Sequence, residues 1–222
     1  MKYLKFFIIS FLVIVSIITH TFSQSVFNIH AGPSIPIGHQ GIYEIHYPDY
    51  KLNSTPSVGI NLGFEYSYEF ALNGLSLFAG LDFFYNYPNK EYRDSIKVIW
   101  KHSGTEITKF HSEYNIPLST GIEYRLLLNE KTSIFCNSGI TLNFHKTSNF
   151  VTDFSTTEFD WATRFGFKIS GGFILISKFK VQLSYWRLGK HEFNYRDIER
   201  PYLNGSKEID IQFLTISFGV NF

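Results

Sequence analysis

The sequence has little cysteine, no marked excess of either charge, and no long apolar run after its first 23 residues. Its only cysteine is Cys136, which excludes an intramolecular disulfide. The 20 basic and 19 acidic residues nearly balance, which argues against a nucleic-acid partner because such a partner needs a basic surface. Past position 23, no segment reaches the roughly 20 consecutive apolar residues of a membrane-spanning helix.

The chain is instead rich in aromatic residues, with 24 Phe, 14 Tyr and 3 Trp, and its apolar residues recur with a period of two. In residues 57–70, large apolar side chains occupy every second position, whereas Gly, Asn, Ser and Glu fill the others. An amphipathic helix cannot have this pattern, so it predicts a strand. Seven further segments have the same alternation: 25–38, 75–87, 114–126, 132–144, 159–173, 179–188 and 208–222.

The first 23 residues have the features of a cleaved signal peptide. Lys2 and Lys5 precede an apolar run over 6–18, and the small residues Thr21 and Ser23 follow it. This order of charged, apolar and small residues is typical of secretory signals. We therefore expect a signal peptide over 1–23 and one domain over 24–222.

The last predicted strand alternates large apolar and small polar residues, as expected for a membrane-insertion strand that closes an outer-membrane barrel. One irregularity precedes it, because Ile209, Ile211 and Phe213 lie in the opposite phase to the residues that follow. We interpret this slip as a β-bulge near Phe213, and the alternative is that the preceding part of the strand stands above the membrane, where its surroundings differ. The apolar face of the strand consists of Leu214, Ile216, Phe218, Val220 and Phe222.

The connections between the predicted strands alternate in length. Short turns near 71–74, 127–131 and 176–178 alternate with long polar loops over 39–56, 88–113, 145–158 and 189–207. Within the second loop, 95–101 and 105–110 are predicted to form a hairpin. This rhythm predicts an all-β fold, an eight-stranded antiparallel up-and-down transmembrane β-barrel with four long extracellular loops.

Two surroundings are compatible with strands that are apolar on one face. In a membrane barrel the apolar face points to lipid, whereas in a soluble lipocalin-like barrel it points to an internal ligand. The glycines favour the membrane barrel because they lie on the polar face. In a membrane barrel this face lines the narrow interior, which needs small residues. These glycines are Gly59, Gly63, Gly80, Gly121, Gly139, Gly166, Gly172 and Gly219.

The polar face also carries charged residues, which should pair because an unpaired charge in a narrow lumen is costly. A static plug that fills the barrel is the favoured interpretation of such pairs, and a gate that opens when pairs exchange is the alternative. The predicted luminal charge network consists of Glu65, Asp82, Glu123, Arg125, Arg164 and Lys168, with Glu69 and Lys180 also pointing inward.

With the signal peptide, the eight alternating strands, the interior glycines and the terminal strand, the chain resembles the small bacterial outer-membrane β-barrel superfamily. Within it, the chain is similar to PorT-like and OmpA-like outer membrane protein beta-barrel domains. The resemblance implies export to the outer membrane, contact with its lipid, and insertion by the barrel-assembly machinery. It implies a non-enzymatic structural or loop-mediated binding protein, or alternatively a transport or secretion accessory component or narrow channel.

Chemistry-bearing motifs are scarce, and we predict no catalytic, cofactor or metal site. The cluster His111-Ser112-Glu113 offers a nucleophile and a base, but neighbouring strand residues point to opposite faces and so cannot easily share a hydrogen bond. Binding is expected instead in the long loops, whose aromatic residues could contact a protein or surface partner. The candidate loop contacts are Tyr43, Tyr47, Tyr50, Trp100, Tyr195 and Tyr202.

Overall fold

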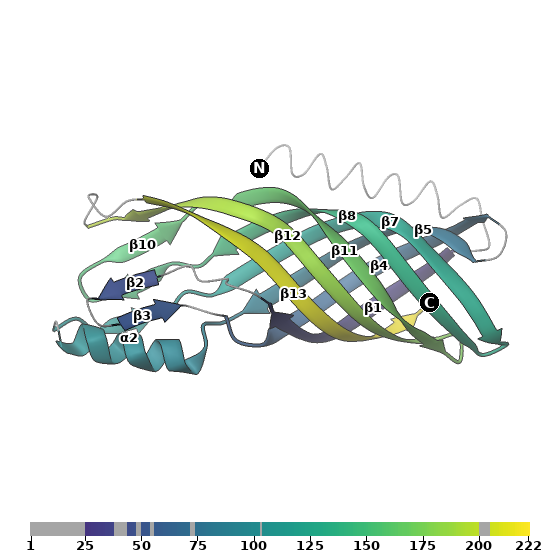
Figure 1. Cartoon of the computed structure of the whole chain (residues 1–222), viewed down its shortest axis with the longest axis horizontal. Helices are drawn as coiled ribbons and strands as arrows, with labels where there is room; N and C mark the ends of the chain where they lie inside the picture. Colours follow the sequence, from purple (N-terminus) through teal and green to yellow (C-terminus); the bar gives the residue numbers. More distant parts are fainter. Residues whose placement is uncertain are drawn as a thin grey trace.

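The computed structural model describes residues 25–37, 44–47, 50–53, 56–71, 74–102, 104–199 and 205–222, so the predicted signal peptide lies outside the described residues. Eight antiparallel strands, each paired with its neighbour along the chain, form a barrel that the pairing of the first with the last strand closes (Figure 1). They are β1 (Ser25–Pro36), β4 (Gly59–Ala71), β5 (Leu75–Asn86), β7 (Glu113–Asn129), β8 (Thr132–Thr147), β11 (Ala162–Leu175), β12 (Phe179–Asp197) and β13 (Gly205–Asn221).

The predicted alternation is confirmed strand by strand, with the apolar faces outside. Phe64, Leu81 and Phe218 are 40%, 38% and 62% exposed, whereas the intervening Glu65 and Asp82 are buried. A lipocalin-like barrel would bury these apolar side chains around a cavity, so that alternative is wrong. Of the described residues, no helix is long and apolar enough to cross a membrane.

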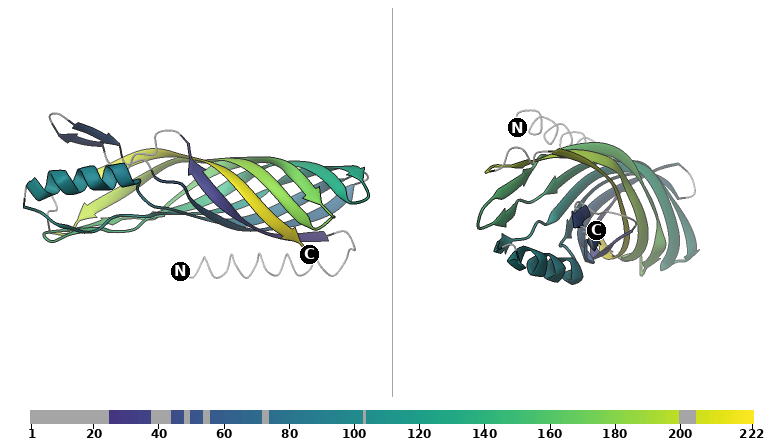
Figure 2. Two further views of the ribbon diagram at one scale, coloured as in Figure 1. Left: turned by 90° about the horizontal axis from the view of Figure 1, so that it is seen from below. Right: turned by 60° about the vertical axis from the view of Figure 1, so that its left-hand side comes forward.

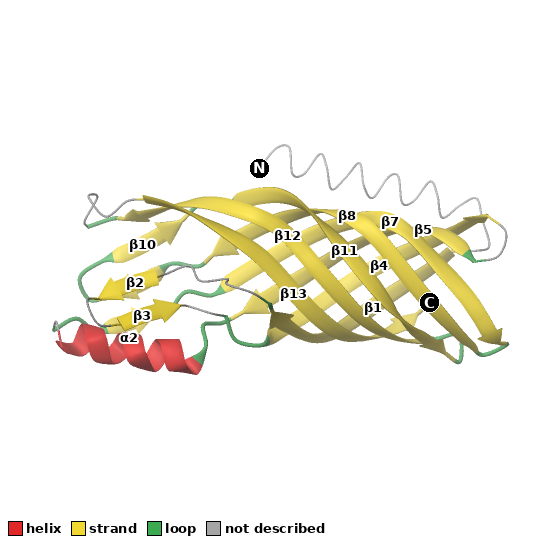
Figure 3. Ribbon diagram, in the orientation of Figure 1, coloured by secondary structure: helices red, strands yellow, loops and turns green. Residues whose placement is uncertain are grey.

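One end of the barrel continues into a cap that the other end lacks (Figures 2 and 3). At the other end, short turns join the strands, for example between β11 and β12. We define the cap as the outer ends of β12 and β13 together with six further elements. These are β2 (Glu44–Tyr47), β3 (Tyr50–Asn53), α2 (Lys90–His102), β6 (Ile107–Lys109), β9 (Phe150–Thr152) and β10 (Thr156–Phe159).

The hairpin predicted over 95–101 and 105–110 is wrong, because 95–101 lies within the helix α2. Tyr92 and Ile96 are buried and Trp100 packs beside them, a spacing of four residues that places all three on one helical face. The side chain of Asn89 accepts a hydrogen bond of 2.7 Å from the amide of Tyr92 and so caps the helix.

The bulge predicted near Phe213 is also wrong, because β13 pairs regularly through this position. The shift in register lies on its partner β12, between Arg187 and Gly189. Ile209, Ile211 and Phe213 point inward, on the same side as Thr215. The change of pattern therefore reflects a change in the barrel interior, which is polar beside Thr215 and apolar beside Phe213.

Candidate functional site: the lumen and the cap

A layer of ion pairs crosses the lumen. The ammonium of Lys168 lies 2.9 Å from a carboxylate oxygen of Glu65. Their strands, β11 and β4, are four places apart in a ring of eight and therefore face each other across the barrel. Lys180 also donates to Glu65 and lies 3.3 Å from Glu123, which Arg125 contacts at 2.9 Å. Opposite walls thus touch at this level.

Aromatic rings and a second polar group support this ionic layer. The ammonium of Lys168 lies 4.7 Å from the ring centre of Trp186, and that of Lys180 lies 4.2 Å from the ring centre of Phe135, both within cation–π range. Asp82 joins His30 instead of a lysine, with 2.9 Å between the imidazole and the carboxylate. No short-range sequence pattern links His30 to Asp82, so the sequence alone did not identify this pair.

Arg164, predicted to join the luminal charge network, lies outside it. Its side chain is exposed, and its Nε donates to the backbone carbonyl of Lys190 at 3.1 Å. The reason is local, since the regular β11–β12 ladder ends at Phe167 paired with Arg187, beside the bulge. Above that point the guanidinium can leave the interior and bridge the two strands. Glu69 is also outside the network, and its carboxylate instead accepts a hydrogen bond from the Gly74 amide beside the turn.

A second, aromatic layer closes the lumen on the cap side. The Phe84 ring on β5 stacks on Phe213 with 5.0 Å between centroids and meets Trp186 edge-on at 5.3 Å. Because β5 and β12 face each other in the ring, this contact also spans the barrel. The layer is continuous with the core of the cap, where Ile96 and Phe150 are buried. The opposite phase of Ile209, Ile211 and Phe213 was the sequence signal for this layer.

The candidate loop contacts fall into three groups. Trp100 packs edge-on against Phe150 at 5.4 Å, so it contributes to the core of the cap. Tyr43 and Tyr202 lie outside the described residues. The remaining three lie in strands, Tyr47 in β2, Tyr50 in β3 and Tyr195 in β12, but their side chains are not among the described ones.

The cluster His111-Ser112-Glu113 is buried beneath the cap. The His111 ring packs edge-on against Tyr92 at 6.0 Å, and burial lowers the pKa of His111 to about 4. The hydroxyl of Ser112 lies 3.3 Å from that of Tyr85. These contacts give the cluster a packing role. In the described part of the chain, no group of three His, Cys, Asp or Glu side chains could hold a metal ion.

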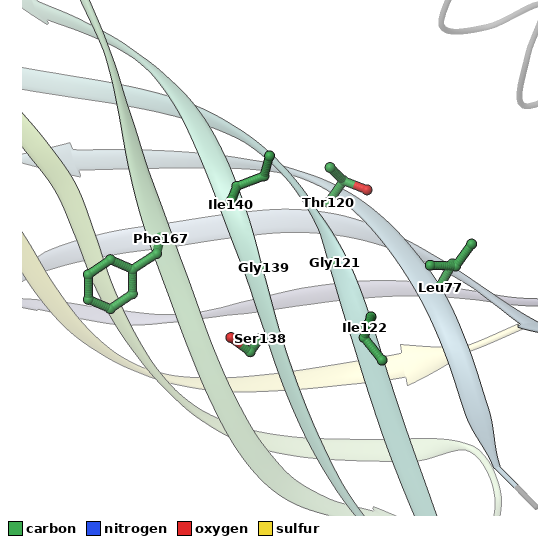
Figure 4. A pocket seen from close by; sticks show the side chains of 8 residues that line it. All are labelled: Leu77, Thr120, Gly121, Ile122, Ser138, Gly139, Ile140 and Phe167. Atoms are coloured by element: carbon green, nitrogen blue, oxygen red, sulfur yellow. The ribbon is translucent and has the colours of Figure 1, made fainter.

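A groove of about 500 Å³ lies on the outer wall of the barrel (Figure 4). It forms where small residues interrupt the apolar surface, so its floor is made by Gly121, Gly139 and Ser138. Apart from Thr120, the surrounding side chains are apolar, as most are elsewhere on this wall. The groove therefore has the character of a lipid-facing surface, and its other lining residues are Leu77, Thr120, Ile122, Ile140 and Phe167.

Comparison with known proteins supports the architecture. No family model matches the sequence, and no curated protein matches it. Among solved structures, the outer membrane protein OprG from Pseudomonas aeruginosa is similar over 90% of this chain and 96% of its own, with a TM-score of 0.52 and 12% identity. A major outer membrane protein from Thermus thermophilus is similar over 89% of this chain and 98% of its own, with a TM-score of 0.52 and 9% identity. The chain has the fold of a small outer-membrane β-barrel.

Proposed function

We propose that the protein is an integral outer-membrane barrel with a closed lumen that acts through its cap, without enzymatic chemistry. Its outer wall supports insertion into lipid, because exposed apolar side chains cover the strands. Aromatic residues lie toward both rims of this surface, where they would meet lipid head groups. At the cap side they include Tyr85, Tyr114 and Trp161, and at the other end Phe70, Tyr124 and Phe222.

The observation that supports a non-conducting barrel best is the contact between opposite walls. Glu65 and Lys168 meet across the lumen, and Phe84 and Trp186 meet across it on the cap side of this ion pair. An eight-stranded barrel is only just wide enough for its side chains to fill. Two layers of side chains that meet across the lumen support a closed interior, so action at the cap is favoured over transport. The solved structures with this fold give no support to a secretion accessory role.

Cell fractionation and planar-bilayer recording test this proposal. The protein should be found in the outer membrane, where lipid and the barrel-assembly machinery are its expected partners, and cap residues should be cleaved by protease added to intact cells. Reconstituted into a planar bilayer, it should give no steady conductance. A persistent open pore in the purified protein, or recovery in the soluble periplasm, would overturn the proposal.

A further inference from the structure

Two large apolar side chains are exposed at the outer tip of the cap. Phe154, in the turn between β9 and β10, is 61% exposed, and Ile198, which follows β12, is 55% exposed. Their backbones are fixed, since the Thr152 hydroxyl accepts hydrogen bonds from the amides of Phe154 and Ser155, and the Ile198 amide donates to Thr156. An apolar side chain on an ordered turn loses little conformational entropy when it binds, so it is suited to anchor a partner.

The sheet face below these anchors is acidic. In the described part of β10, β12, β13 and their ends, three basic residues on this face are each already paired: Arg187 with Asp210, Lys190 with Glu208, and Arg196 with Asp160. Three further carboxylates form no ion pair among the described residues, although Glu158 lies opposite Arg196 in the β10–β12 ladder. These are Glu158, Glu192 and Glu199, although Glu199 accepts a hydrogen bond from the Thr156 amide.

Two of the carboxylates on this face repel each other in the folded protein. Glu192 and Glu208 are directly opposite in the β12–β13 ladder, a placement that destabilises an antiparallel pair when the charges are alike. Lys190 contacts Glu208 at 3.0 Å and relieves this repulsion only in part. A cationic partner would relieve the rest, so the repulsion itself favours binding of positive charge.

We propose that this face, with Phe154 and Ile198 as apolar anchors, is a docking surface for a basic polypeptide that also carries apolar side chains. The inference rests on the proposed function of the cap as the acting part of the molecule. The sign of the charge disfavours anionic lipid and nucleic acid, which the unpaired carboxylates would repel. Apolar contact with Phe154 would supply affinity, and the carboxylates would supply attraction and orientation.

Binding of synthetic peptides tests the proposal on the full chain in zwitterionic lipid nanodiscs. Fluorescent peptides of alternating Lys and Leu, Lys and Ser, or Glu and Leu serve as probes, and empty nanodiscs measure binding to lipid. The Lys–Leu peptide should bind best, and added salt should weaken its binding. Phe154→Ser should weaken binding of the Lys–Leu peptide about tenfold, as expected for loss of an aromatic anchor. The same variant should change binding of the Lys–Ser peptide little. Val98→Ser, at an exposed site on α2, is the matched control and should change neither.

A second variant separates binding from folding. Glu192→Gln should weaken binding of the Lys–Leu peptide severalfold. It should also raise the melting temperature, because it removes the repulsion from Glu208. Glu91→Gln on α2 should do neither. Equal binding of the Glu–Leu and Lys–Leu peptides, or undiminished binding by the Phe154 variant, overturns the docking surface. Failure here leaves the barrel non-conducting, whereas failure of the proposed function appears as an open pore, so the two outcomes are distinct.

Discussion

At the scale of single residues, Lys168 shows how the lumen accommodates charge. Its side chain is fully buried, yet the ammonium contacts Glu65 and lies over Trp186. Burial of an ion pair costs much of the energy that its attraction provides, and loss of one partner leaves the other charge without compensation. The Glu65 carboxylate has a second cation, Lys180, and this determines how it responds when Lys168 is changed.

We expect Lys168→Glu to destabilise the barrel more than Lys168→Met. The methionine variant leaves Glu65 paired with Lys180, whereas the glutamate variant places a new carboxylate beside it, which should cost at least about 2 kcal/mol more. Heat-dependent electrophoretic mobility in detergent measures the unfolding temperature. Lys178, exposed in a turn, provides the control, because its Glu and Met variants should melt alike. Equal melting of the two Lys168 variants would count against the ionic layer.

His111 gives a pH-dependent prediction for the cap. Its pKa is about 4 in the folded protein and about 6.5 in an unfolded chain, so the unfolded chain binds the proton first. The contribution of His111 to stability is therefore complete above about pH 6.5 and falls as the pH drops toward 4, by about 3 kcal/mol in total. Near-ultraviolet circular dichroism follows the melting temperature, which should change less favourably from pH 7 to 4.5 in the wild type than in His111→Phe. The same change in both proteins would show that other groups cause it.

At the scale of elements, the strands could be predicted from the sequence and the cap could not. Period-two alternation located the barrel strands to within about three residues at each end, except that β12 extends further, as far as Asp197. The alternation is strong there because one face meets an apolar surface along the whole strand. Residues 95–101 were predicted as a strand of a hairpin, but packing of Tyr92, Ile96 and Trp100 against the cap core favours a helix.

The strand β13 shows why one change of pattern was misread. A bulge and a change of surroundings both change the phase in which apolar residues alternate along a strand. A single sequence cannot distinguish these two causes. Here the interior beside Phe213 is itself apolar, because Phe84 and Trp186 reach it from other strands. These partners are distant in the sequence, so only the closed barrel identifies them. The same reason explains why Arg164 was placed inside, since the bulge that releases it lies on β12.

At the scale of the whole molecule, closure of the sheet determines which residues can meet. Each of the layers joins strands that face each other, and no local motif encodes such contacts. Sequence reasoning therefore identified most members of the charged layer from their shared face but could not assign their partners. The two layers share Trp186, whose ring lies over the Lys168 ammonium, but each has its own contact between facing strands, so the lumen should stay sealed by either alone.

We therefore expect a pore only when both layers are removed. Glu65→Ser with Lys168→Ser removes the central ion pair, and Phe84→Ala with Trp186→Ala removes the aromatic contact across the barrel. Each double variant should remain silent in planar bilayers, whereas the fourfold variant should pass small ions, because an eight-stranded barrel without its filling side chains has room for water. Leu183→Ala, on the outer wall, should remain silent as the wild type does. If the fourfold variant keeps the heat-modifiable mobility of a folded barrel yet does not conduct, other luminal side chains seal the barrel. If either double variant conducts, the layer that it lacks is needed by itself to hold the barrel closed.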